Sequence, residues 1–169
     1  HAFARLHARV PGARLWLYGA DFGSGQTAEQ WAQQEGIAAG MEFIGSIPYA
    51  RLLDDLASAD VLLHPSLEES FGMSVAEAMA LGVPVIGGAC SGAVPWVIGD
   101  GGLVTDVRSA SAIATALHTL LYIPGEYRRC RHAAVARTGQ MFSVSHVADT
   151  YLGHYSEIIL ECKGLNWRE

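Results

Sequence analysis

Two carboxylates lie eight positions apart around a glycine in the segment HPSLEESFGMSVAEAMALGVPVIGG, residues 64–88. Glu69 precedes Gly72 in a predicted loop, and Glu77 lies about one turn inside the helix that should follow. Glycine has no Cβ, so a ligand can approach the backbone at Gly72. The first amides of a helix have no intrahelical partners and favour an anion such as phosphate. Two acceptors around an anion cradle suit a ligand with hydroxyls at both ends and phosphate between them, as in a nucleotide sugar.

The same residues also have a purely structural interpretation. Ser74-Val75-Ala76-Glu77 fits the capping box S-x-x-E, in which Ser74 caps the helix and Glu77 accepts a bond from the amide of Ser74. Glu69 would then be a solvated loop acid. The local pattern favours neither interpretation over the other.

Short apolar strands alternate with helices along the chain. The strands are expected at residues 14–19, 41–45, 60–65, 84–88 and 102–105. The helices are expected at residues 27–36, with Thr27 as N-cap, and at 49–59, 74–81, 109–122, 126–138 and 143–162. This alternation predicts an α/β fold, a Rossmann-like parallel sheet with helices on both faces. Ligands of such sheets bind beyond the carboxyl ends of the strands, which here are residues 19–26, 45–49, 65–73 and 87–95.

Composition narrows the class of protein. The 169 residues are 50% hydrophobic and 17% charged, which suits one compact domain with a substantial core. A net charge of -6 argues against a nucleic-acid-binding protein. We expect no signal peptide and no transmembrane segment, because neither an h-region nor a run of about 20 apolar residues occurs. Three scattered cysteines, Cys90, Cys130 and Cys162, make a disulfide framework or zinc site improbable and favour a reducing, cytoplasmic setting.

The surroundings of the two carboxylates carry a longer pattern. Its residues are Pro65-Ser66, Glu69, Phe71-Gly72, Glu77-Ala78-Met79-Ala80, Gly82 and Pro84-Val85-Ile86. This pattern resembles the signature of the retaining GT-B glycosyltransferases of the glycogen-synthase and sucrose-synthase type, the group 1 glycosyl transferases. The resemblance extends over residues 2–104, through AFARLHARVPGARLWLYG, MEFIGSIPYARLLDDLASADVLLHPS and SGAVPWVIGDGGLV.

The resemblance implies that residues 1–169 form a single nucleotide-sugar-binding domain, the C-terminal half of a GT-B fold. Glu77 would then bind the ribose hydroxyls, and Glu69 would be the catalytic residue, in contact with the donor sugar. The other implied donor contacts are the backbone of Phe71, Gly72 and Met73, the tip Gly45-Ser46-Ile47 beside the base, and Gly19. The implied reaction transfers a sugar with retention, needs no metal or cofactor, and stabilises the diphosphate leaving group electrostatically.

The chain departs from the family pattern in two places. The family's Pro-Glu is replaced by Pro95-Trp96, and we expect Trp96 to pack a loop rather than to stack on a ligand. The chain also opens at His1, inside the helix that follows the family's first strand and its basic, glycine-rich loop. We therefore expect a fragment of a larger two-domain enzyme, inactive alone, whose N-terminal acceptor domain is its natural partner. The full-length protein would be cytoplasmic, with peripheral contact to the inner face of a membrane left open.

A missing first strand has a structural consequence. In the strand order 3-2-1-4-5-6 the first strand is central, and two unpaired edges inside a domain are costly. We expect the fragment either to close this gap or to fill it by self-association or association with another chain. The alternative to a donor-binding domain is a non-catalytic, flavodoxin-like binding or regulatory module in which Glu77 only caps its helix.

Overall fold

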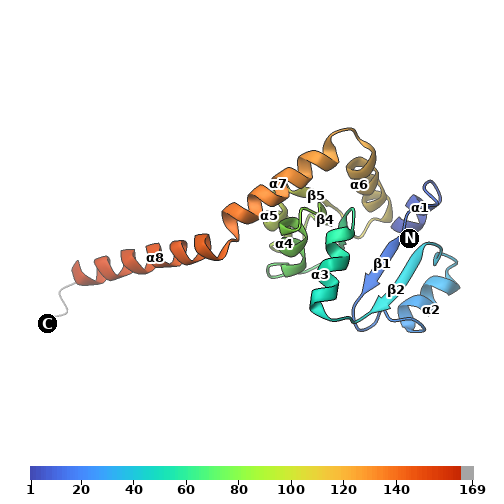
Figure 1. Cartoon of the computed structure of the whole chain (residues 1–169), viewed down its shortest axis with the longest axis horizontal. Coiled ribbons are helices and arrows are strands. Elements are labelled where there is room, and N and C mark those ends of the chain that lie inside the picture. The colour runs from blue at the N-terminus through green and yellow to red at the C-terminus, as the bar shows by residue number, and fades with distance from the viewer. Residues whose placement is uncertain (165–169) are drawn as a thin grey trace.

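Strands and helices alternate as expected in the computed structural model, which describes the backbone of residues 1–164 and the side chains of residues 1–161 (Figure 1). The strands are β1 (Leu15–Tyr18), β2 (Met41–Gly45), β3 (Leu62–His64), β4 (Val85–Gly88) and β5 (Gly102–Thr105). The helices are α1 (Ala2–His7), α2 (Thr27–Gln34), α3 (Tyr49–Ser58), α4 (Met73–Ala80), α5 (Val94–Ile98), α6 (Ala110–Tyr122), α7 (Glu126–Met141) and α8 (Val144–Gly164). The predicted N-cap Thr27 is wrong by one residue, because Gln26 is the N-cap and Thr27 begins α2.

The strands form two parallel sheets rather than one. One sheet has the order β1-β2 and the other has the order β3-β4-β5. Within residues 1–164 no ladder joins β1 to β3, so the expectation that the chain closes the central gap is wrong. The reason lies in the packing, since Phe3 and Leu6 of α1 share one apolar cluster with Leu15 of β1 and Leu63 of β3. Side chains rather than backbone hydrogen bonds therefore connect the two sheets, and filling of the gap by another chain stays a prediction.

Helices cover both faces of the larger sheet, as the doubly wound arrangement requires. Successive residues of β4 point to opposite faces. Val85 belongs to a buried cluster with α4 and α5, and Ile86 belongs to a second cluster with α1 and α6. Both side chains are fully buried. The predicted Rossmann-like fold is confirmed, and it places the β3–α4 segment at the carboxyl edge of the sheet.

Helix α3 is the bridge between the two sheets. The Tyr18 hydroxyl at the end of β1 donates a 3.1 Å hydrogen bond to Asp55 of α3, and Arg51 Nε donates a 2.8 Å bond to the same carboxylate. Burial and the bond to Asp55 raise the pKa of Tyr18 to about 12. On its other side, α3 packs Leu56 against the cluster that holds α4. The position of α3 therefore sets the distance between the β2 tip and α4.

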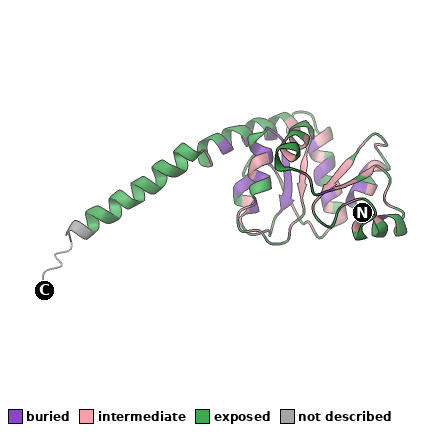
Figure 2. Cartoon of the chain, turned by 60° about the horizontal axis from the view of Figure 1, so that its bottom comes forward, coloured by how far each residue is buried: buried purple, intermediate pink, exposed green. Residues whose placement is uncertain are grey.

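Helix α8 projects away from the domain. Figures 1 and 2 show it as a long helix that follows α7 and is exposed over residues 144–161. Several apolar side chains are exposed along it, namely Tyr151, Leu152, Tyr155, Ile158 and Ile159. The helix runs close to its predicted bounds of 143–162. Among the described helices, none has both the length and the apolar content needed to cross a bilayer.

Candidate functional site

The β3–α4 loop ends in a glycine that begins helix α4. Gly72 is the N-cap, with φ 88° and ψ 64°, a left-handed conformation that L side chains rarely adopt. The first amide bonded within the helix is that of Val75, which donates to the carbonyl of Gly72. The amides of Met73 and Ser74 precede it, and both residues are exposed. The residues that carry the two amides are thus exposed, although Gly72 itself is buried, and helix-start amides of this kind favour an anion.

The capping-box interpretation is wrong. Ser74 is the second residue of α4 rather than its N-cap, and no side chain caps this helix in the part of the chain that the structure describes. The Ser74 hydroxyl instead lies 3.4 Å from Nδ1 of His64. Glu77, which a capping box would turn back to the Ser74 amide, bonds to another element altogether. Neither Ser74 nor Glu77 therefore serves as a cap of α4, which was the structural alternative to ligand binding.

Glu69 lies directly over the start of α4. An added Cβ on Gly72 would be 3.4 Å from Cγ of Glu69, and the Glu69 carboxylate accepts a 3.2 Å bond from the amide of Ser70. Its other oxygen is 3.7 Å from Nε2 of His64. That nitrogen is buried and has no hydrogen-bond partner among the described residues. His64 therefore lies between Glu69 and Ser74. These three side chains lie together at the start of α4, and this region is called the rim.

Glu77 lies on the same side of α4 as Ser74, because residues three apart on a helix are neighbours. Its Oε1 accepts a 2.7 Å hydrogen bond from the hydroxyl of Tyr49, the first residue of α3. This bond raises the pKa of Tyr49, since the phenol is a donor to a carboxylate. Glu77 thus shares one side of α4 with Ser74, which approaches His64 beside Glu69. The contacts of Glu69 and Glu77 with a ligand remain predictions.

The predicted base-side tip, Gly45-Ser46-Ile47, connects β2 to Tyr49 and so lies next in the chain to the Glu77 contact. Gly45 is buried and accepts a 3.1 Å bond from the amide of Gly19. Gly19 is therefore beside this tip, and its contact with a donor stays a prediction. The rest of its glycine-rich loop is occupied internally, because the amides of Gly23 and Gly25 donate to Gln26 and Glu29. That loop is therefore a turn with its own internal bonds, and Gly23 also forms an isolated antiparallel bridge with Ile44 of β2.

The turn after β4 holds the loop that carries Glu69 in place. After β4, the amide of Ala93 donates a 3.2 Å bond to the carbonyl of Glu69, and the Ser91 hydroxyl donates to the carbonyl of Ser66. Ser91 is almost completely buried. The backbone that carries Glu69 is therefore fixed at two points, although the loop itself is exposed at Leu67 and Glu68.

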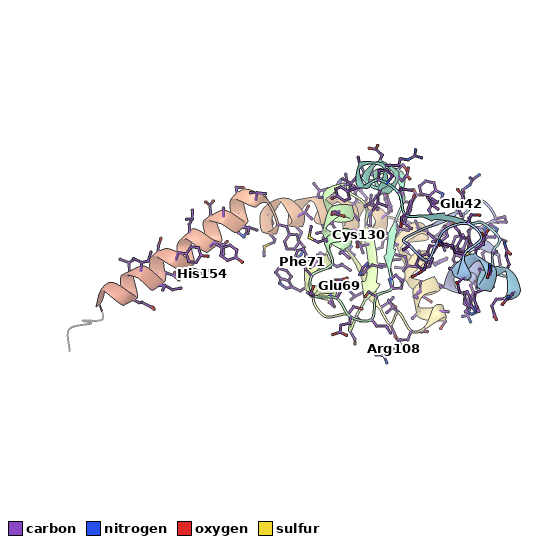
Figure 3. All side chains as sticks on the ribbon, turned by 90° about the horizontal axis from the view of Figure 1, so that it is seen from below. Glu42, Glu69, Phe71, Arg108, Cys130 and His154 are labelled. Carbon is purple, nitrogen blue, oxygen red and sulfur yellow. The ribbon has the colours of Figure 1, made fainter. Side chains whose placement is uncertain are left out.

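The side chain of Phe71 points away from the helix start. Its ring is 5.4 Å from that of Phe142 and 6.5 Å from that of Trp96, and the Trp96 and Phe142 rings are 5.5 Å apart. Arg137 lies 5.7 Å from the Trp96 ring and donates a 3.0 Å bond to the carbonyl of Val97. Figure 3 shows Glu69 and Phe71 on the side of the domain nearest α8. Trp96 thus contacts Phe71 and Phe142, although it is 54% exposed, and the contact of the Phe71 backbone with a ligand stays a prediction.

Tyr49 is the residue of this site that the sequence analysis did not identify. Its position immediately after the Gly45–Pro48 tip was the available signal, because a strand-tip aromatic can reach the neighbouring rim. The pairing with Glu77 joins residues 28 apart in sequence, so spacing alone does not indicate it.

Known glycosyltransferases are similar to this chain in sequence. The sequence model of the family Glycosyl transferases group 1 matches residues 1–137. D-inositol 3-phosphate glycosyltransferase of Mycobacterium tuberculosis is 31% identical over 164 residues, which span 93% of this chain and 34% of that protein. The chain therefore spans about a third of the length of the curated relatives that it matches.

Solved structures agree on the fold. Sucrose-phosphate synthase from Thermosynechococcus elongatus aligns with a TM-score of 0.76 and 25% identity, over 95% of this chain and 42% of that one. HepE of Anabaena, solved in complex with UDP-glucose, aligns with a TM-score of 0.75 and 22% identity, over 93% of this chain and 44% of that one. Both comparisons cover almost all of this chain and less than half of the other protein.

Proposed function

This chain belongs to the family Glycosyl transferases group 1, and we propose that its domain binds the nucleotide diphosphate sugar donor of a retaining sugar transfer. The observation that carries the proposal is the rim at the start of α4. The amides of the exposed residues Met73 and Ser74 lie there between Glu69, which is close to Gly72, and Glu77, which accepts a bond from Tyr49. A diphosphate at the amides would leave one acid for the ribose hydroxyls and the other for the sugar.

The proposed roles follow from the chemistry of each group. The amides of Met73 and Ser74 would stabilise negative charge on the diphosphate as the bond to the sugar breaks, which is electrostatic stabilisation of a leaving group. Glu77 would accept bonds from the ribose, and Glu69 would contact the sugar at the reacting end. The tip at Gly45–Ile47 would lie beside the base. No metal or cofactor has a role in this scheme.

The proposed roles of this domain do not include binding of the acceptor. We propose that a second domain holds the acceptor, that the two together carry out transfer, and that residues 1–169 alone do not turn over a nucleotide sugar. We also propose a cytoplasmic location for the protein. The relatives' names support the reaction class, and HepE, solved with UDP-glucose, supports the donor class.

The test is nucleotide binding by the purified chain. Thermal unfolding would be followed with UDP, ADP and GDP at increasing concentrations. A ligand that binds only the folded state at a hundredfold excess over Kd stabilises it by about 2.7 kcal/mol. We expect at least one nucleotide to raise the midpoint, and Glu77→Ala to weaken binding so that the rise becomes smaller at the same nucleotide concentration.

The matched control is Glu68→Ala, which removes an exposed acid from the same loop. It should leave the ligand-induced rise unchanged. The proposal fails if none of the three nucleotides stabilises the chain, or if the two substitutions reduce the rise equally.

A further inference from the structure

The hydrogen bond between Tyr49 and Glu77 is the most specific polar contact at this rim. The donor and acceptor oxygens are 2.7 Å apart, and the Tyr49 ring is 59% exposed. An exposed phenol gains little from burial, so its position depends on this bond. A hydrogen bond to a charged carboxylate is short and stronger than one between neutral groups.

The position of the bond in the fold gives it a second effect. Tyr49 is the first residue of α3, directly after the β2 tip, whereas Glu77 belongs to α4 on the other sheet. No backbone ladder connects these sheets within residues 1–164. The Tyr49–Glu77 bond therefore connects the tip proposed for the base to the acid proposed for the ribose. The base and the ribose adjoin in a nucleotide, so binding both requires a fixed distance between the tip and the acid.

The bond leaves Glu77 able to bind a ligand. An ionised carboxylate has two oxygens with about four lone-pair sites, and Tyr49 occupies one site on Oε1. The phenol restricts the rotation of the carboxylate and leaves the other oxygen for a diol. Fixing an acceptor before the ligand arrives reduces the entropy lost on binding.

We propose that Tyr49 is a positioning residue that orients Glu77 for the ribose hydroxyls and so gives the site its preference for ribonucleotides over 2′-deoxyribonucleotides. This inference rests on the proposed function and goes beyond it, because it assigns sugar discrimination to a residue outside the β3–α4 segment. Tyr49 acts through Glu77 and needs no direct contact with the ligand.

The test compares Tyr49→Phe with the unaltered chain. Dissociation constants would be measured calorimetrically for UDP, ADP and GDP and for the 2′-deoxy form of each. The substitution keeps the ring and removes only the donor. We expect the ratio of deoxy to ribo dissociation constants to fall by about threefold to tenfold, the effect of one lost hydrogen bond. The 2′-deoxy dissociation constants should change much less. Tyr122→Phe, which removes a hydroxyl from an exposed tyrosine on α6, should leave the ratio unchanged.

A double-mutant cycle makes the result specific to this pair. If Tyr49 acts through Glu77, Tyr49→Phe should have no effect on the ratio in a Glu77→Ala background. Equal weakening of ribo and deoxy ligands, an unchanged ratio, or the same effect in both backgrounds would each overturn the inference while leaving nucleotide binding intact. Failure of the unaltered chain to bind any of the six nucleotides would overturn the proposed function and this inference with it.

Discussion

The amide of Ala93 donates a 3.2 Å hydrogen bond to the carbonyl oxygen of Glu69, and this bond brings Gly92 against the same carbonyl. A Cβ added to Gly92 would lie 2.2 Å from that oxygen, and the residue has φ +56°. The turn after β4 and the loop that carries Glu69 therefore fit together only when residue 92 has no side chain. This contact is the basis of the first prediction.

Gly92→Ala should lower the free energy of unfolding by about 2 kcal/mol or more, because it adds a backbone clash to an unfavourable φ. Gly125→Ala is the matched control, with φ +88° and open space around the added Cβ. It should cost about 1–2 kcal/mol from conformation alone. Urea denaturation of both variants measures the difference, and equal losses would contradict the close approach to Glu69.

Ser74→Ala should change the free energy of unfolding by less than about 0.5 kcal/mol, because Ser74 does not cap α4. Ser109→Ala provides the comparison. The Ser109 hydroxyl accepts a 3.2 Å bond from the amide of Ala112 and caps α6, so its loss should cost about 1 kcal/mol. Chemical denaturation of the two alanine variants measures both losses in free energy of unfolding. A larger loss for Ser74→Ala than for Ser109→Ala would support the capping-box interpretation.

Trp96 and Phe142 should be energetically coupled, since their rings are 5.5 Å apart in an edge-to-face arrangement. Their alanine substitutions should show a coupling free energy of about 0.5–1.5 kcal/mol in a double-mutant cycle. A cycle between Trp96 and Tyr122, which lies on α6, should be additive. Loss of additivity in both cycles would mean that truncating Trp96 disturbs the fold generally.

The Tyr18 phenol should make stability fall at alkaline pH. Its pKa is raised from 10.0 to about 12, first by burial and then by the bond to Asp55, so folding favours the protonated form. The contribution is complete below pH 10 and is lost as the pH rises from 10 towards 12. In urea denaturation at several pH values, the stability difference between the unaltered chain and Tyr18→Phe should therefore shrink across this interval. A difference that stays constant to pH 12 would contradict the raised pKa.

Cys90 should react with iodoacetamide at least about ten times faster than Cys130, because the thiolate is the nucleophile and must be accessible. Cys90 is exposed, whereas Cys130 is fully buried and burial raises the pKa of its thiol. The comparison is best made by mass spectrometry on a Cys162→Ser variant, which leaves two thiols. Comparable rates under native conditions would show that α7 opens readily.

Local sequence patterns predicted much of this fold. The apolar runs at Leu15–Tyr18 and Val85–Gly88 became strands because β-branched and large apolar side chains suit a buried parallel sheet. The serine at Ser109 capped its helix as such residues usually do. The spacing of Glu69, Gly72 and Glu77 around a helix start also predicted their common rim, since all three lie within one strand–loop–helix segment.

Features that depend on distant contacts were not predictable in this way. Ser74 and Gly72 are both acceptable N-caps by residue type. The structure has Gly72 as the N-cap, and the Glu69 side chain lies close to it. The Tyr49–Glu77 bond and the separation of β1 from β3 depend on how α3 and α1 pack against other elements. Periodicity describes one element at a time and contains no information about such pairings.

The absence of a backbone ladder between β1 and β3, within the residues described, has a mechanical consequence. Hydrogen bonds between strands fix both spacing and register, whereas contacts among apolar side chains are non-directional. Helix α3 therefore supplies directional contacts of the kind that a ladder would provide, through the Tyr18–Asp55 bond to β1 and the Tyr49–Glu77 bond to α4.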